Sequence, residues 1–469
     1  MKRSAFRWLA VSALMLSGAI AFAEDRPRYG GTLRVQLRDA VFSLDPKDAA
    51  DLTGVRHRFA FMLFDRLTRI DDQGRVRPQL AVSWSSDAQR KTWRFTLRSG
   101  VVFHDGSPLT VATVIANFAN DARWQVRNGN SPMVVVFECA NPIYDLPALL
   151  AGAKHSIITR SAEGPQGTGP FRIATWQPGR QLSLTANPDY FEGRPYLDGV
   201  ELLMGNSLRE QLIDLRLNRD DLAEVDMDQA RRLTAASQRV ESAAASRLLA
   251  ILFRGTNLKP AVRELLAHAI NRETIHAAIL KKSGGPAPSI LPQWLTGYAM
   301  LLADAPDPAR IQRLRTDIGT APTIYLAYDP AEPMNKAIAD RIAVNARDVG
   351  ITVQVFGEKL FVKKNVPGAA PGQTSRADAV LISLPIASAN ASQALAQIAD
   401  AVQLEQNDIL AAESPEQLYA AEKTLLESYH FVPVAHLPAA VWTSTRVRNW
   451  KISADGRWKL EQVWLDSVQ

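Results

Sequence analysis

The side chains best suited to chemistry in this chain are seven histidines and a single cysteine. Histidine can serve as a general acid or base near neutral pH, and it is a common metal ligand. His268 and His276 lie eight residues apart, so they cannot form the i, i+4 pair that binds zinc on a protease helix. His430 and His436 flank the segment FVPVA, and no Cys or further His nearby completes a metal site. The pattern therefore predicts no metal site.

Motifs that supply a nucleophile or bind phosphate are also missing. The chain has no G-x-S-x-G elbow and no P-loop pattern. Cys139 stands in the apolar run VVVFECA, which favours a buried small residue over a reactive thiol. We therefore expect a protein that is not an enzyme, with no catalytic residue and no cofactor. A secreted hydrolase is the alternative from a different class.

The first residues predict where the protein works. Residues 1–7 carry three positive charges, residues 8–20 form an apolar run too short to span a bilayer, and residues 21–23 (AFA) fit an A-x-A cleavage pattern. We expect a signal peptide over residues 1–23, cleaved after Ala23, and a mature protein in the periplasm. A membrane anchor is the alternative. No cysteine lies near the cleavage pattern, so we expect no lipid anchor.

Composition limits the partners of the mature protein. The whole chain is formally +6, and loss of the three signal charges leaves 51 basic against 48 acidic side chains, or +3. No Lys/Arg-rich block with interleaved aromatic residues is present, so we expect no nucleic-acid partner. About 446 mature residues, in a chain with 46% apolar content, are enough for two or three domains.

Local patterns predict a meander of strands early in the chain. In Thr92–Arg98, apolar residues alternate with polar ones, which is the period of a strand with one buried face. We expect Ser99-Gly100 to close this strand, Val101–Phe103 to form the return strand and Asp105-Gly106 to turn, because glycine accepts positive φ.

The second half of the chain alternates strands with helices. Thr323–Pro330 predicts a strand and a turn, residues 334–350 a helix that ends in glycine, and residues 351–356 the next strand. A right-handed crossover would make these two strands parallel. Pro260 and Ser414-Pro415 each begin a further helix. An α/β architecture with mixed sheets follows.

Segments along most of the chain resemble, in order, the bacterial solute-binding proteins of family 5, the peptide- and nickel-type periplasmic receptors of ABC importers. The matching segments are residues 30–35 (GGTLRV), 43–46 (SLDP), 63–71, 78–106, 167–202, 261–275 (AVRELLAHAINRETI), 288–298 (PSILPQWLTGY) and 307–319. Their common order makes a chance match very improbable, although each short motif alone would be weak.

The resemblance implies a two-lobed periplasmic-binding-protein architecture of type II-like form with mixed sheets. It assigns residues 24–250 and 441–469 to lobe I, with an extra subdomain at about 47–160, and residues 251–440 to lobe II. A peptide or other small solute would bind between the lobes, and the closed form would be recognised by an ABC permease and ATPase complex in the inner membrane. The receptor is expected to be a monomer. A sensor or buffer receptor with the same fold is the alternative.

The resemblance also places candidate ligand-binding residues by position alone. They are Arg38, Asp39 and Val41 after the first strand, Arg254 and Asn257 at the lobe crossing, Trp294 in the loop 288–298, and Ser383, Ser388 and Asn390 after a strand of lobe II. A hinge turn is the alternative role for Asn257. Packing within its own lobe is the alternative for Trp294, and the three residues of lobe II could be ordinary polar loop residues.

The identity of the ligand stays open. Peptide-binding relatives typically carry a Trp-x-x-Asp motif where this chain has residues 378–392, and its carboxylate pairs with the peptide ammonium. This chain has neither the Trp nor the Asp there. A buried ammonium without a counter-charge is costly, so a peptide N-terminus would need another acid. An oligopeptide, an amine-blocked peptide, a non-peptide solute and a chelated metal all remain candidates.

Overall fold

The computed structural model describes most of the chain. The described ranges are residues 26–48, 55–162, 164–206, 208–254, 258–298, 308–320, 323–358, 376–453 and 455–466. The predicted signal peptide and Asn257 lie outside these ranges. None of the described helices combines the length and the apolar character needed to cross a membrane.

One large mixed sheet runs through the molecule. Its strands follow the order β10-β11-β12-β1-β13-β19-β14-β18-β16-β17, and β15 pairs with β19. The bounds are β1 (Thr32–Gln36), β10 (Phe171–Gln177), β11 (Gln181–Ala186), β12 (Gly199–Leu203), β13 (Leu222–Val225), β14 (Val240–Phe253), β15 (Gly285–Pro286), β16 (Thr323–Tyr328), β17 (Thr352–Gly357), β18 (Ala379–Pro385) and β19 (Phe431–Thr443). Since β1 pairs in parallel with β12 and β13 while β14 pairs antiparallel with β18 and β19, the predicted mixed α/β class is confirmed.

Two long strands, β14 and β19, join the two halves of this sheet. They pair antiparallel from Val240 opposite Trp442 to Leu252 opposite Phe431, with register shifts on either side of Ala245. Ala245 faces Pro438, which has no N–H to donate, so an irregularity there is expected. We call the strands β10-β11-β12-β1-β13 the first lobe and β18-β16-β17 the second lobe. The predicted boundaries near residues 250 and 440 fall within β14 and β19 and stay predictions.

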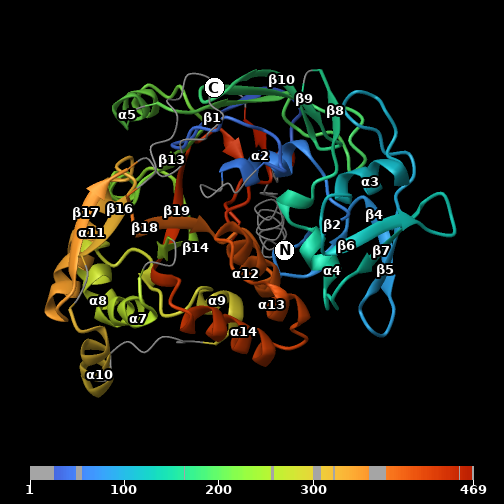
Figure 1. Cartoon of the computed structure of the whole chain (residues 1–469). Coiled ribbons are helices and arrows are strands. Elements are labelled where there is room, and N and C mark those ends of the chain that lie inside the picture. The colour runs from blue at the N-terminus through green and yellow to red at the C-terminus, as the bar shows by residue number, and fades with distance from the viewer. Residues whose placement is uncertain are drawn as a thin grey trace, which may run out of the picture.

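The second lobe contains the predicted β-α-β unit. Helix α11 (Pro333–Asp348) connects β16 to β17, and the two strands are parallel. Gly350 follows the C-cap Val349 of this helix, and its φ of +86° is the left-handed conformation that glycine accepts without strain. Helix α7 (Pro260–Ala269) begins at Pro260 as predicted. In Figure 1 these elements form the left part of the molecule, with α10 (Pro308–Ile318) below them.

A separate four-stranded sheet, in the order β4-β5-β7-β6, lies at the right of Figure 1; we call it the subdomain, and the predicted bounds at about 47–160 stay a prediction. Its elements are β4 (Ala81–Ser86), β5 (Thr92–Leu97), α3 (Val111–Phe118), β6 (Trp124–Asn128) and β7 (Val134–Cys139). The prediction that Val101–Phe103 returns along β5 was wrong, since β5 pairs with β4 and β7. Val135 to Phe137 are buried, so the apolar strand β7 lies beside β5 in the interior of the sheet. The short segment 101–103 does not pair with β5, and its Val101 and Phe103 are buried in the core.

Shorter elements complete the structure. They are α2 (Val55–Leu63), β2 (Thr68–Ile70), β3 (Val76–Pro78), α4 (Leu146–Leu150), β8 (Thr159–Ser161), β9 (Gly164–Gln166), α5 (Leu208–Arg216), α6 (Met227–Ala235), α8 (Arg272–Thr274), α9 (Gln293–Thr296), α12 (Ala391–Ala401), α13 (Asn407–Ala411), α14 (Pro415–Glu427), β20 (Val447–Arg448) and β21 (Trp464–Leu465). One apolar cluster extends from the subdomain through α4 to α12 and α14. The subdomain and the second lobe therefore share a continuous core.

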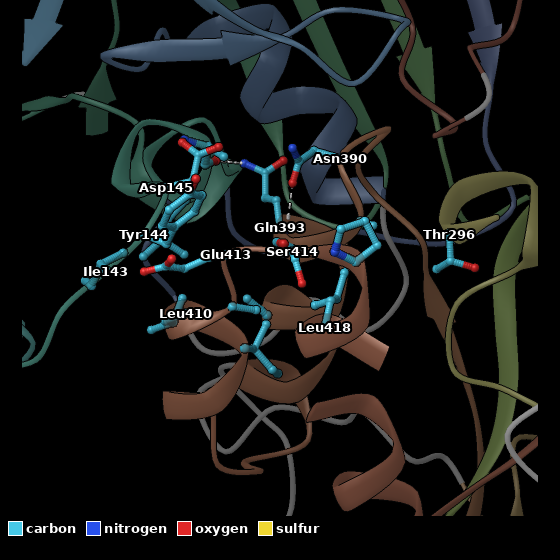
Figure 2. Close-up of a pocket in the computed structure, with 18 of the residues that line it drawn as sticks. Ile143, Tyr144, Asp145, Thr296, Asn390, Gln393, Leu410, Glu413, Ser414 and Leu418 are labelled. Atoms are coloured by element: carbon cyan, nitrogen blue, oxygen red, sulfur yellow. Dashed lines mark hydrogen bonds between the residues drawn. The ribbon is translucent and has the colours of Figure 1, made fainter. Parts of the chain in front are cut away.

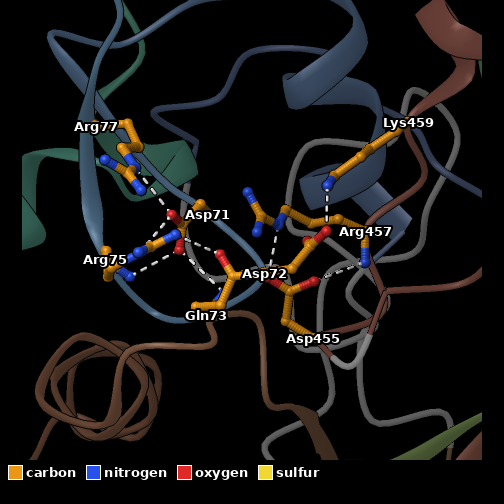
Figure 3. A network of polar contacts seen from close by, with 8 residues as sticks. All are labelled: Asp71, Asp72, Gln73, Arg75, Arg77, Asp455, Arg457 and Lys459. Atoms are coloured by element: carbon orange, nitrogen blue, oxygen red, sulfur yellow. Dashed lines mark hydrogen bonds and ion pairs between the residues drawn. The ribbon is translucent and has the colours of Figure 1, made fainter.

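Polar contacts tie the C-terminal segment to the turn between β2 and β3 (Figure 3). Lys459 Nζ donates to Asp72 at 2.6 Å. Asp71 accepts from Arg75 Nε at 3.0 Å and from Arg77 Nε at 2.8 Å, which closes the turn. The last part of the chain thus returns to the segment that leads into the subdomain.

A buried carboxylate fixes the loop 288–298 of the second lobe. Glu422 on α14 is fully buried, and it accepts from the backbone N–H groups of Ile290 at 2.6 Å and Leu291 at 3.0 Å. The hydroxyl of Tyr298 donates to the same carboxylate at 2.5 Å. Burial raises the pKa of Glu422, and these donors oppose the rise.

Replacing this carboxylate should destabilise the protein. In Glu422→Ala two buried N–H groups and a hydroxyl lose their acceptor, so we expect the free energy of unfolding to fall by about 3 kcal/mol. Urea unfolding followed by circular dichroism measures it. Glu427→Ala, an exposed position on the same helix, is the matched control and should change little. Equal midpoints for the two variants would contradict the role given to Glu422.

Candidate ligand-binding cleft

A cavity of about 100 Å³ lies between the two lobes. The end of β1, with β13, β14 and β19, forms one side, and the N-terminal part of α11 forms the other. Its charged lining residues are Arg38, Asp39, Arg58, Glu224, Asp226, Arg247 and Glu332. A smaller cavity of about 30 Å³ adjoins it and shares Arg58 and Arg247. So many charges around a small space require close pairing, because each charge loses water there.

Glu224 is the centre of the pairing on the first lobe. Its carboxylate accepts from the backbone N–H of Arg38 at 3.0 Å and forms an ion pair with Arg58. Burial by itself would raise the pKa of Glu224, but the Arg58 guanidinium and the Arg38 N–H hold the pKa below its ordinary value. Glu224 is therefore ionised and neutralised by Arg58.

An ion pair crosses the cleft from lobe to lobe. Arg38 Nη2 lies 3.3 Å from Glu332 Oε2, and Glu332 is the residue just before α11. The two side chains are 24% and 32% exposed, so water screens their attraction only in part. This contact draws the two lobes together in the conformation seen here.

Asp39 is the carboxylate of the cleft that has no partner. No hydrogen bond or ion pair to it comes from any residue within the described ranges. Burial raises the pKa of Asp39 to about 6, and the positive charge of Arg247 opposes that rise. Arg247 itself donates from Nε to the Ser383 hydroxyl at 3.0 Å.

The structure brings three of the predicted site residues together in the cleft, namely Arg38, Asp39 and Ser383. Val41 is instead buried in the apolar core of the first lobe. Arg254 follows the far end of β14, where its backbone N–H donates to the carbonyl of Asp378 at 2.7 Å. Neither Val41 nor Arg254 lines the cavity between the lobes.

Trp294 lies near the crossing strands. Its indole N–H donates to the carbonyl of Ala245 at 3.2 Å, and its side chain is 40% exposed. The hydrogen bond connects the loop 288–298 to β14 beside the register shifts. A partly exposed ring here is available for contact with other groups.

Asn390 caps a helix beside a second cavity, of about 290 Å³ (Figure 2), and Ser388 supports Asn390. Asn390 Oδ1 accepts from the N–H of Gln393 at 3.0 Å and caps α12, while its Nδ2 donates to the Gly74 carbonyl at 3.3 Å. The buried Ser388 hydroxyl accepts from the N–H of Asn390 at 3.0 Å. Asp145 similarly caps α4 at this cavity. These polar groups serve the helix ends between the subdomain and the second lobe.

Sequence reasoning missed five charged residues of the cleft, namely Arg58, Glu224, Asp226, Arg247 and Glu332. A signal existed for two of them, because Glu224 in LAEV and Arg247 in SRLLAILF are charges within apolar strands. A charge in such a run usually has a partner or a function. Arg58 and Glu332 carry no comparable local signal, since a helix and a turn both accept charges freely.

Three of the described histidines pack against the backbone. His104, His155 and His436 each contact a backbone carbonyl, at 3.0, 2.8 and 3.0 Å. Burial lowers the pKa of these side chains to about 4, 3 and 4, respectively, so they are neutral at pH 7. Cys139 is buried as predicted, and burial raises the pKa of its thiol to about 11. Within the described residues, no three His, Cys, Asp or Glu side chains come together as a metal site.

Solved structures with the same fold are two-lobed binding proteins. NikA from Staphylococcus aureus, in complex with Ni(L-His)2, has a TM-score of 0.76 at 17% identity and covers 93% of this chain and 100% of its own. AppA from Bacillus subtilis, in complex with a nonapeptide, has a TM-score of 0.76 at 18% identity over 94% and 100% of the two chains. These likenesses show the fold, and they confirm the predicted two-lobed architecture.

The family follows from the sequence match. Residues 75–366 match the bacterial extracellular solute-binding proteins, family 5 middle, and the chain belongs to this family. A curated relative, the probable D,D-dipeptide-binding periplasmic protein DdpA of Escherichia coli, is 25% identical over 61% of each chain. The chain spans less than two thirds of the length of the first curated relatives that it matches.

Breaking the ion pair between the lobes should favour opening. In Glu332→Gln the Arg38 guanidinium loses its partner across the cleft, so we expect the closed form to lose up to about 1 kcal/mol. Small-angle scattering of the ligand-free protein should show a larger radius of gyration. Asp340→Asn on the same helix is the control, because Asp340 pairs with Lys336 of α11. Identical scattering curves for both variants would exclude a closing role for this pair.

The unpaired Asp39 should make stability depend on pH. Its folded pKa of about 6 exceeds the ordinary 3.8, so its stabilising contribution is complete below pH 3.8 and is lost as pH rises through about 6. Asp39→Asn removes this contribution. We therefore expect the melting temperature of the wild type, relative to the variant, to fall across this interval. Scanning calorimetry at a series of pH values tests it, and a difference that stays constant would show that Asp39 titrates normally.

Proposed function

We propose that this protein is the solute-binding receptor of an ABC importer, which captures a peptide or other small solute between its lobes and delivers it to the permease and ATPase complex. The observation that carries the proposal is the charged cavity between the lobes, crossed by the pair of Arg38 and Glu332, in a chain of this family. Arg38, Asp39 and Ser383 are the predicted residues that we place in contact with the solute.

Capture works through a shift between open and closed forms. A solute that touches both lobes has a higher affinity for the closed form and so increases its population. The crossing strands β14 and β19 are the connection about which the lobes would move. Binding of this kind makes and breaks no bond, and we propose that the protein is not an enzyme. We further propose that it acts as a monomer in the periplasm, after removal of residues 1–23.

The solute should remain bound through purification from the native periplasm. Native mass spectrometry should detect a mass above that of the polypeptide, which identifies the class of solute. Adding the same solute to protein freed of it should raise the melting temperature by mass action and reduce the radius of gyration. A protein that carries nothing, and that no periplasmic fraction stabilises, would refute the binding function.

A further inference from the structure

The charges of the cleft do not all neutralise one another. Arg58 pairs with Glu224, and Arg38 pairs with Glu332 across the gap. The remaining charged lining residues are Asp226, Asp39 and Arg247. Asp226 accepts from the N–H of Gln229 and caps α6, so its carboxylate is in use. Asp39 and Arg247 are left facing the same cavity.

These two residues do not pair with each other. The charge of Arg247 acts on Asp39, but no ion pair joins them, and Arg247 uses only Nε, toward Ser383. The terminal amino groups of Arg247 have no hydrogen-bond partner in the described part of the chain. A carboxylate and a guanidinium held apart in a half-buried space leave two unmet interactions of opposite sign.

The space between them limits the size of an occupant. The cavity volume of about 100 Å³ is below the roughly 150 Å³ of an apolar protein cavity that takes up benzene. That volume suits the ammonium, the carboxylate and a small side chain of an amino acid. In the conformation seen here it is too small for the chain of an oligopeptide.

We propose that the cleft binds a small zwitterion of the α-amino-acid class, with its ammonium at Asp39 and its carboxylate at Arg247. This inference rests on the proposed receptor function and specifies its solute. The ammonium supplies the cation that Asp39 lacks. The carboxylate accepts a forked pair of hydrogen bonds from the free end of the guanidinium. Residues 378–392 lack the Asp of the Trp-x-x-Asp motif. In this arrangement Asp39 of the first lobe takes its place.

Calorimetry with defined probes tests this assignment. The solute-free protein is titrated with each common free L-amino acid, with the N-acetyl and carboxamide forms of any that binds, and with trialanine. We expect at least one free amino acid to bind and to raise the melting temperature. Its N-acetyl and carboxamide forms, and trialanine, should each bind at least tenfold more weakly, because each lacks one charge or exceeds the cavity.

Two variants separate a direct contact from a structural effect. Asp39→Asn should weaken the free amino acid at least tenfold yet leave the weak affinity for the N-acetyl form unchanged. Arg247→Gln should also weaken binding of the free amino acid at least tenfold. It should leave the affinity for the carboxamide form unchanged. Asp340→Asn is the control and should bind as the wild type does. Asp39→Asn removes an unpaired, half-buried charge, so it should fold at least as stably as the wild type near neutral pH.

A dependence on pH supplies a second readout. Arg38, Arg247, Glu224 and Glu332 are the charged groups that act on Asp39, whose pKa is raised to about 6. Below that pH the ammonium must displace a proton from Asp39, so affinity for the free amino acid should fall as pH falls. In Asp39→Asn this dependence should vanish.

The outcomes distinguish the inference from the function on which it rests. If trialanine or a blocked amino acid binds more tightly than every free amino acid, the zwitterion assignment is wrong and the receptor function stands. If the free amino acid binds equally well to Asp39→Asn, the assignment is also wrong. If neither these probes nor any periplasmic fraction binds, the receptor function fails with it.

Discussion

The backbone pairing of β14 with β19 is the interaction on which the rest of the structure depends. These two strands link the lobes, because β19 also pairs with β13 and β14 also pairs with β18. Their own pairing shifts register at three places. Proline at position 438 interrupts the regular pairing opposite Ala245. The connection is therefore irregular near its centre, which is where the lobes would move in the proposed function.

The same crossing places the charges of the cleft. Arg247 projects from β14, Glu224 lies on β13, and Asp39 follows β1, so neighbouring strands bring distant parts of the sequence to one cavity. Each of these charges loses water on folding and needs a partner. Glu224 has Arg58, and Arg38 has Glu332 on the opposite lobe. Asp39 is left without a partner, and a site that is incomplete in this way gains most from a solute that completes it.

Much of the architecture was readable from local patterns. Alternation predicted β5, the pattern of Thr323–Pro330 predicted β16, and the helices that start at Pro260 and Ser414-Pro415 were found where the sequence placed them. The return strand at 101–103 was wrong because pairing partners depend on which apolar strand gains most from burial, and β7 lies more than thirty residues further along. Of the predicted site residues, Arg38, Asp39 and Ser383 line the cleft, while Asn390 caps α12. The position of a residue along the chain did not show whether it lines the cleft or caps a helix.

The sequence by itself determined the class of protein, because strand and helix periods, turn residues and ordered motifs are local properties that survive without a structure. It also restricted the ligand, because residues 378–392 carry no Trp-x-x-Asp motif. Only the tertiary structure decided which charges neutralise one another. Pairs such as Arg38 with Glu332 join residues almost three hundred positions apart, and an ion pair depends on a separation of a few ångströms that no local pattern encodes.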